Sequence, residues 1–199
     1  MISAVVLAAG RSTRFGGTKQ LLKMDGGTLL GTAVRRFTES VVDEVIVVLG
    51  HDSELIKQKV VLGRAKVVTN MDYDRGLSSS IRAGIEAVAP ESEAVILALG
   101  DQPFISAATI SALVQKYAET GGPVVAPYFR GRRGNPVLFD RKLFPSLMGI
   151  EGARGAKAAI REHGWKVVRV NVKDRSVLLD IDSEGDYERA LGELSENQD

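Results

Sequence analysis

The sequence predicts an α/β fold in which a doubly wound, mostly parallel Rossmann-like sheet carries helices on both faces. Short runs rich in Val, Ile and Leu, most of them ending at Gly or Ala, alternate with segments of helical period. Runs that are apolar on both faces are typical of a parallel sheet between two helical layers. This alternation continues to about residue 120, so right-handed βαβ units are expected.

The first part of the chain supplies most of the expected strands and helices. The runs ISAVVLA, EVIVVLG and EAVILALG are the strongest strand candidates, and AKVVTN is a shorter one. In the first helical segment, apolar residues recur on one face and Thr28 is the expected N-cap. The strands are expected at 2–8, 44–50, 65–70 and 93–100, and the helices at 28–40, 52–61, 78–89 and 106–119.

The second part is less regular. A fifth strand is expected at 122–128, and the glycine-rich turn GRRGNP then leads into another strand. An alanine-rich helix, a strand and a closing helix are expected at 152–164, 165–172 and 183–194. The chain has 199 residues, enough for one sizeable core and too few for two. We therefore expect a single domain over residues 1–199, in which both parts share one sheet.

Composition and charge exclude several classes of function. The formal net charge is +1, so no overall field favours binding to nucleic acid or to a membrane surface. There is no cysteine, which removes disulfides, thiolate chemistry and cysteine-based metal sites and fits a reducing compartment. The first ten residues lack a positively charged leader and are too short to span a bilayer. We expect a cytoplasmic protein.

The segment LAAGRSTRFGGTK, residues 7–19, ends the first apolar run with small residues and cations. Backbone N–H groups and fixed cations can together hold a triphosphate. The segment is not a Walker loop, because Gln20 follows Lys19, and Gly10-Arg11-Ser12 does not match the dinucleotide fingerprint. On composition alone, an anion-binding loop and a solvated surface loop are equally good interpretations.

Two acidic segments lie where strands are expected to end. Asp101 directly follows the run EAVILALG, at the sheet edge where ligands gather in open α/β folds. The segment LLDIDSEGD is expected to form a short strand with Asp180 and Asp182 on one face, so spacing does not separate them. Mg²⁺ needs only one or two carboxylates besides phosphate oxygens and water, and these residues are candidate ligands.

Six segments, taken in order, resemble the motifs of the MobA-like nucleotidyltransferases. The first loop is similar to the signature L-A-A-G-x-S-x-R-[MF]-G-x-x-K of that family. The other segments are NMDYDRGLSSSIRAGI, LGDQP, GNPVLF, GARG and DIDSEGDYERAL, and together they span nearly the whole chain. Within the family, the resemblance is closest to the molybdenum cofactor cytidylyltransferases.

The resemblance implies a nucleotide site in residues 1–120 and an acceptor site in residues 121–199. In this family L-A-A-G accompanies cytidine nucleotides, so Ala9 favours CTP. The implied catalytic residues are Arg14, Lys19 and Asp101. The implied nucleotide-binding residues are Leu7, Ala8, Ala9, Gly10, Arg11, Ser12, Asn70, Gly76 and Ser80.

The resemblance also implies a Mg²⁺ ion and a molybdopterin-type acceptor. The metal ligands would be Asp101 together with Asp182 or Asp180, with Asp182 favoured. The implied acceptor-binding residues are Arg133, Asn135 and Arg154. Two departures lie in the acceptor half: Asn135 replaces a frequent His, and Ile150 replaces the usual aspartate. These departures weaken the assignment of the acceptor and leave nucleotidyl transfer intact.

The expected function is Mg²⁺-dependent transfer of CMP from CTP to a phosphorylated molybdopterin, with release of pyrophosphate. A molybdoenzyme or its chaperone would receive the product. The phosphate nucleophile is ionised near neutral pH, so no general base is required. The alternatives are transfer to a sugar or alcohol phosphate, and a chaperone that binds nucleotide or cofactor without turnover; a dehydrogenase ranks third because the dinucleotide fingerprint fails.

Overall fold

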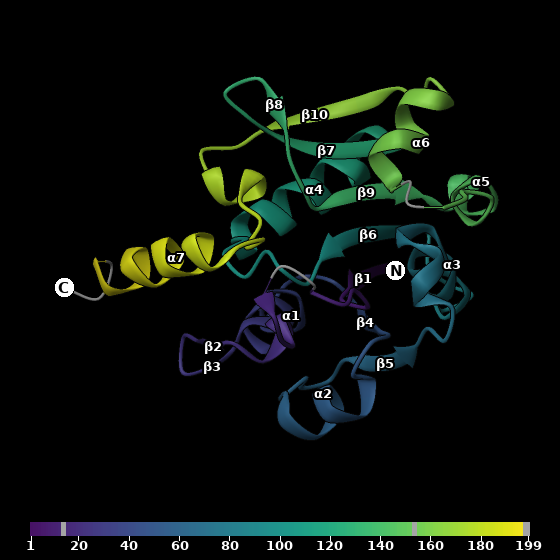
Figure 1. Cartoon of the computed structure of the whole chain (residues 1–199). Coiled ribbons are helices and arrows are strands. Elements are labelled where there is room, and N and C mark those ends of the chain that lie inside the picture. The colour runs from purple at the N-terminus through teal and green to yellow at the C-terminus, as the bar shows by residue number, and fades with distance from the viewer. Residues whose placement is uncertain (13–14, 153–154, 197–199) are drawn as a thin grey trace.

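The computed structural model describes residues 1–12, 15–152 and 155–196. It contains an eight-stranded sheet with the order β10-β7-β9-β6-β1-β4-β5, in which β8 pairs with β7 (Figure 1). The strands are β1 (Ile2–Leu7), β4 (Glu44–Leu49), β5 (Lys66–Thr69), β6 (Ala94–Leu99), β7 (Val124–Phe129), β8 (Arg132–Arg133), β9 (Val137–Asp140) and β10 (Val167–Asn171). A separate hairpin is formed by β2 (Lys23–Met24) and β3 (Gly27–Thr28).

The sheet is mostly parallel, which confirms the predicted class. Strand β1 pairs in parallel with β4 and β6, β4 with β5, and β7 with β10, whereas β9 runs antiparallel to β6 and β7. From β1 the chain moves outward through β4 to β5 and then crosses to β6 on the other side of β1. Such a reversal of strand order opens a crevice at the carboxyl ends of the strands.

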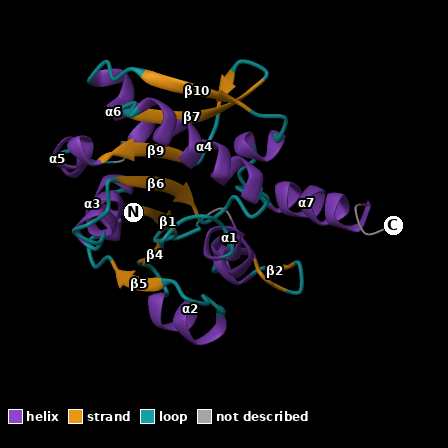
Figure 2. Ribbon diagram, turned by 180° about the vertical axis from the view of Figure 1, so that it is seen from behind, coloured by secondary structure: helices purple, strands orange, loops and turns teal. Residues whose placement is uncertain are grey.

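Helices cover both faces of the sheet, as predicted (Figures 1 and 2). Alternation along β1 sends Ala4 and Val6 into one core cluster and Val5 and Leu7 into the other, as expected for successive side chains of a strand. The first cluster includes residues of α1 (Leu29–Thr38), α2 (Ser53–Lys59) and α4 (Ala107–Thr120). The second includes residues of α3 (Leu77–Glu86), α5 (Phe144–Met148) and α6 (Ala156–Glu162).

Two helix starts follow the expected capping chemistry. The Thr28 side chain accepts a hydrogen bond from the Gly31 N–H, and that of Ser106 accepts one from the Thr109 N–H. Each bond satisfies an N–H group that the first helical turn leaves unpaired. The sequence-based boundaries of α1 and α4 are therefore correct to within about two residues.

The closing helix, α7 (Glu184–Glu196), projects from one side of the sheet (Figure 1). Its Tyr187 hydroxyl donates to the Lys23 carbonyl, and Ala190 belongs to a small apolar cluster with Met24 and Leu29. The helix thereby fastens the end of the chain to the β2–β3 hairpin. Within the described residues, no helix has both the length and the apolar character needed to cross a membrane.

The close packing of α3 on β1 gives a first testable prediction. A Cβ atom at Gly84 would lie 2.4 Å from Cγ1 of Val5 and 3.2 Å from Cγ2 of Val48. Gly84→Ala should therefore lower the free energy of unfolding by about 1–3 kcal/mol, the usual cost of an overpacked core. Urea denaturation measures the change.

Gly192→Ala is the matched control. Gly192 lies in α7, where an added Cβ would meet no described atom within 4 Å. Because alanine is the better helix former by up to about 1 kcal/mol, this variant should be as stable as the parent or slightly more stable. Equal losses in the two variants would show that close approach to β1 does not require Gly84.

Candidate functional site

The carboxyl ends of β1 and β6 border a cavity of about 280 Å³, which we call the strand-end cavity. It lies where the strand order reverses, the position at which α/β sheets bind ligands. Gly100 follows β6, and a Cβ there would lie 2.8 Å from Cβ of Ala8. The lining residues are Leu7, Ala8, Gly10, Ser12, Phe15, Lys19, Gln20, Leu29, Gly100, Asp101 and Asp182.

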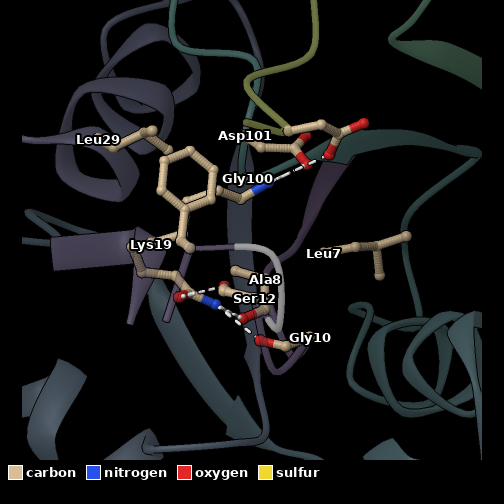
Figure 3. Close-up of a pocket in the computed structure, with 11 residues that line it drawn as sticks. Leu7, Ala8, Gly10, Ser12, Lys19, Leu29, Gly100 and Asp101 are labelled. Atoms are coloured by element: carbon tan, nitrogen blue, oxygen red, sulfur yellow. Dashed lines mark hydrogen bonds and ion pairs between the residues drawn. The ribbon is translucent and has the colours of Figure 1, made fainter. Parts of the chain in front are cut away.

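Lys19 links its own loop to two distant segments at this cavity, and Figure 3 shows its contact with Asp101. Its Nζ atom lies 2.9 Å from Oδ2 of Asp101, 2.6 Å from the Ile181 carbonyl oxygen and 3.4 Å from Oδ1 of Asp182. The Lys19 side chain is only 12% exposed, so its ammonium is partly withdrawn from water and interacts strongly with these groups. The structure thus brings Lys19, Asp101 and Asp182 together.

The two carboxylate oxygens of Asp101 differ in their contacts. Oδ2 accepts from Lys19, whereas Oδ1 is buried and has no hydrogen-bond partner among the described residues. A buried oxygen without a partner carries a desolvation cost that a cation can offset. In the described part of the chain, no three His, Asp or Glu side chains are grouped to hold a metal. The donor set therefore fits a cation that takes most of its ligands from a bound molecule or water.

Residues 179–183 do not form the short strand predicted for LLDIDSEGD. They form an irregular segment after the 3-10 turn Arg175–Leu178, because the Ile181 N–H bonds to the Asp101 carbonyl rather than to a strand neighbour. The two aspartates consequently diverge. Asp182 lines the strand-end cavity, whereas Asp180 accepts a hydrogen bond from Nε2 of Gln102.

Burial raises the pKa of Asp180 above its ordinary value, and the negative charge of Asp101 adds to the effect. The hydrogen bond from Gln102 acts in the opposite direction without cancelling the shift. Asp180 is thus a less favourable place for a full negative charge than an exposed aspartate would be.

Gln20 braces the loop that precedes Lys19, a role that the sequence analysis missed. The residue is 5% exposed, and its Nε2 donates to the carbonyls of Ala8 and Gly10 at 3.0 and 3.1 Å. Its Oε1 accepts from the Ser12 hydroxyl at 3.2 Å. A polar residue directly after the loop gives no sign that its amide folds back, so the sequence offers no signal for this contact.

Arg11 is turned towards the segment after β5. Its guanidinium makes two hydrogen bonds to Asp74, at 2.8 and 2.7 Å, and lies 5.5 Å from the ring centre of Tyr73. Both charged side chains are more than half exposed, so the pair contributes little to stability. The contact nevertheless ties residues 10–12 to residues 72–76.

Asn70 directly follows β5, Gly76 ends the segment 72–76 and Ser80 lies in the first turn of α3; none of the three lines the strand-end cavity. Nδ2 of Asn70 donates to the hydroxyls of Ser79 and Ser80, at 2.9 and 3.1 Å. Gly76 has a φ of 99°, a conformation that favours glycine. All three hold the shape of the turn before α3, and their contact with a nucleotide stays a prediction.

The predicted acceptor residues Arg133 and Asn135 line a second cavity of about 290 Å³, the β6–β9 cavity. Leu7 lines both cavities, so the two adjoin. Ile150 is 7% exposed and packs in the core on the α3 face, which explains why no carboxylate stands there. Arg14 and Arg154, two further predicted site residues, lie outside the described residues.

Ala9 is 5% exposed and packs in the core on the α3 side, and its carbonyl accepts from the His51 N–H. It is not among the residues that line the strand-end cavity. Ala8, Leu7, Gly10 and Ser12 do line it. Of the loop residues predicted to bind the nucleotide, these four therefore line the space available to a ligand.

Comparisons with known proteins agree with this geometry. A family model described as the MobA-like NTP transferase domain matches residues 4–167. Nicotine blue oxidoreductase of Paenarthrobacter nicotinovorans is 30% identical over 194 residues, which cover 92% of each chain. The molybdenum cofactor cytidylyltransferase of Escherichia coli K12 is 25% identical over 189 residues, which cover 94% of this chain and 93% of that one.

Solved structures are similar over almost the whole chain. The homologue of Mycobacterium tuberculosis Rv0371c from Mycobacterium sp. strain JC1 has a TM-score of 0.89 at 33% identity, covering 98% of this chain and 97% of that one. Rv0371c in complex with manganese has a TM-score of 0.83 at 29% identity, covering 96% and 98%.

The bracing role of Gln20 can be tested by Gln20→Leu. The substitution keeps the approximate volume and leaves the carbonyls of Ala8 and Gly10 without this donor, so the free energy of unfolding should fall by about 1–3 kcal/mol. Gln115→Leu, on the exposed side of α4, is the control and should change it by less than about 0.5 kcal/mol. If urea denaturation finds the two variants equally stable, Gln20 does not brace the loop.

Proposed function

The chain belongs to the MobA-like NTP transferase family, and from this premise we propose that it transfers CMP from CTP to a phosphorylated molybdopterin-type acceptor, releasing pyrophosphate. The observation that carries the proposal is the contact of Lys19 with Asp101 and Asp182 at the strand-end cavity. One cation and two carboxylates from distant segments meet at the crevice where α/β sheets bind ligands. A nucleotidyltransferase needs this combination of charges.

In nucleotidyl transfer an acceptor phosphate oxygen attacks the α-phosphorus in line, and the bond from that phosphorus to the bridging oxygen of pyrophosphate breaks. Negative charge grows on the α-phosphate oxygens and on the leaving pyrophosphate. Lys19 is the side chain we assign to this charge, because it lines the cavity and its side chain is only 12% exposed. Positioning and charge neutralisation supply most of the rate in such reactions.

We assign the divalent cation to Asp101 and Asp182, with Asp180 in the weaker position. The unpartnered Oδ1 of Asp101 supports the first assignment. The place of Asp182 in the lining supports the second, whereas Asp180 is bonded to Gln102. A bound Mg²⁺ would neutralise phosphate charge and orient the triphosphate. A mycobacterial neighbour was solved with manganese, which is compatible with an oxygen-ligand site of this kind.

Two observations favour CTP and a molybdopterin-type acceptor. The loop begins L-A-A-G, and a relative with 25% identity is a molybdenum cofactor cytidylyltransferase. On this assignment, residues 1–120 bind the nucleotide and residues 121–199 bind the acceptor. Leu7, Ala8, Gly10 and Ser12 would contact the nucleotide directly, while Asn70, Gly76 and Ser80 would shape the segment beside it.

The main alternatives differ in acceptor or in chemistry. Transfer to a sugar or alcohol phosphate keeps the same nucleotide site and changes only the partner in the β6–β9 cavity. A binder without turnover has no need of the Lys19–Asp101 pair. One relative is named an oxidoreductase, but the loop of this chain lacks the G-x-G-x-x-G fingerprint of dinucleotide sites.

Asp101→Asn tests the charge assignment. The substitution keeps the shape of the side chain and removes its negative charge, so kcat for pyrophosphate release should fall about 100-fold or more. Glu54→Gln, at an exposed carboxylate of α2, is the control and should keep the parent rate. An Asp101→Asn enzyme within a few-fold of the parent would remove Asp101 from the metal site.

The substrate assignment predicts a pattern across nucleotides and acceptors. With Mg²⁺ and molybdenum cofactor, pyrophosphate release should be fastest with CTP; with a sugar phosphate it should be at background. A phosphate-release assay coupled to pyrophosphatase measures both. Turnover with a sugar phosphate and none with molybdenum cofactor would reverse the choice of acceptor. Tight cofactor binding with no pyrophosphate from any nucleotide would favour a non-catalytic binder.

A further inference from the structure

A residue that lines the β6–β9 cavity carries a buried hydrogen-bond acceptor without a partner among the described residues. Gln102 lines this cavity and is 2% exposed. Its Oε1 is buried and receives no hydrogen bond from any residue that the structure describes. An unpaired buried amide oxygen costs a protein free energy, so a donor from outside the chain is the natural partner for it.

The orientation of this amide is fixed by Asp180. Nε2 of Gln102 donates to Oδ1 of Asp180. A flipped amide would set its oxygen against the carboxylate, an arrangement without a donor between the two. Ile181, which follows Asp180 in the chain, donates its N–H to the Asp101 carbonyl at 3.1 Å. This bond holds residues 180–181 against residues 101–102. The unpaired atom of the Gln102 amide is therefore its oxygen, a hydrogen-bond acceptor, rather than its NH₂ group.

The other residues that line the β6–β9 cavity indicate the size and charge of a ligand that would fit it. Leucine, isoleucine and valine side chains from α3, β6, β9 and the 3-10 turn at 175–178 form the apolar walls, among them Leu77, Leu97 and Val137. Arg132, Arg133 and Lys157 also line the cavity and supply positive charge, and Asp180 adds one carboxylate. At about 290 Å³ the space is near the lower limit for small-molecule sites. A small ligand with an apolar body and one anionic group matches this lining.

We propose that Gln102 is a specificity-determining residue of the acceptor site: its side-chain oxygen accepts a hydrogen bond from an N–H of a planar nitrogen heterocycle that also carries an anionic group. This inference rests on the proposed function, in which the β6–β9 cavity receives the acceptor. The apolar walls disfavour a sugar, whose many hydroxyls would lose hydration there without partners. A heterocycle buries its faces and needs only its few ring-edge groups satisfied.

The proposal can be tested by ligand binding without turnover. The probes are pterin-6-carboxylate, which has ring-edge N–H donors, and quinoxaline-2-carboxylate, a bicycle with a carboxylate and no N–H group. Fluorescence titration of the first, and its displacement by the second, should give a parent Kd at least about 10-fold lower for the pterin. In Gln102→Met the pterin Kd should rise about 10-fold while the quinoxaline Kd stays the same, so that the preference is lost.

Matched variants separate recognition from structure. Gln115→Met, on the exposed side of α4, should leave both Kd values unchanged. Lys157→Ala should weaken both probes by the same factor, because each has one carboxylate. If Gln102→Met does not fold, Gln102→Asn, which withdraws the amide by one methylene, should lose pterin binding selectively. Equal losses for the two probes, or a parent protein without preference, would overturn the proposal.

A kinetic measurement distinguishes this proposal from the proposed function. With the cognate acceptor, Gln102→Met should raise the acceptor KM about 10-fold and leave the CTP KM unchanged. Probe selectivity that depends on Gln102 without pyrophosphate release would keep the inference and refute the transferase. Normal turnover with an acceptor KM that Gln102→Met does not change would do the reverse.

Discussion

The site depends on one ammonium group that is largely withdrawn from water. Lys19 follows the amino-terminal loop, yet its Nζ contacts Asp101 after β6 and the backbone and side chain of residues 181–182. These contacts set the position of the loop, because a charge withdrawn from water must stay close to its partners. They also concentrate opposite charges at the one crevice that the strand order opens. Without Lys19, two carboxylates would face each other there with no compensating cation.

The fold and the position of the site follow from local patterns in the sequence. Continuous apolar runs identify β1, β4 and β6, and residues directly after β1 and β6 line the strand-end cavity. Thr28 and Ser106 mark helix starts because their hydroxyls accept backbone N–H groups within the same turn. The expected sheet edge brings the segments of Lys19 and Asp101 to one place although 82 residues separate them, and the family resemblance adds the role of each side chain.

The misses share a different cause, which is contact between segments distant in sequence. Residues 179–183 alternate like a strand but bond to Asp101 and Gln102 instead of to a neighbouring strand. The amide of Gln20 folds back onto the Ala8 and Gly10 carbonyls, as no local rule requires. Helix α5 is missed for a separate reason: it has only five residues, Phe144–Met148, too few for a 3.6-residue period to be distinguished from a loop.

The neighbouring residues Asp101 and Gln102 contribute to the two adjoining cavities, one residue to each. Asp101 lines the strand-end cavity and Gln102 the β6–β9 cavity. Asp182 and Asp180 are arranged in the same way, since Asp182 lines the strand-end cavity and Asp180 the β6–β9 cavity. Lys19 contacts both Asp101 and Asp182, and Gln102 donates a hydrogen bond to Asp180. The bond from the Ile181 N–H to the Asp101 carbonyl lies between these two links. A displacement of either segment must therefore disturb the strand-end cavity and the β6–β9 cavity together, so the geometry for one ligand is set jointly with the geometry for the other.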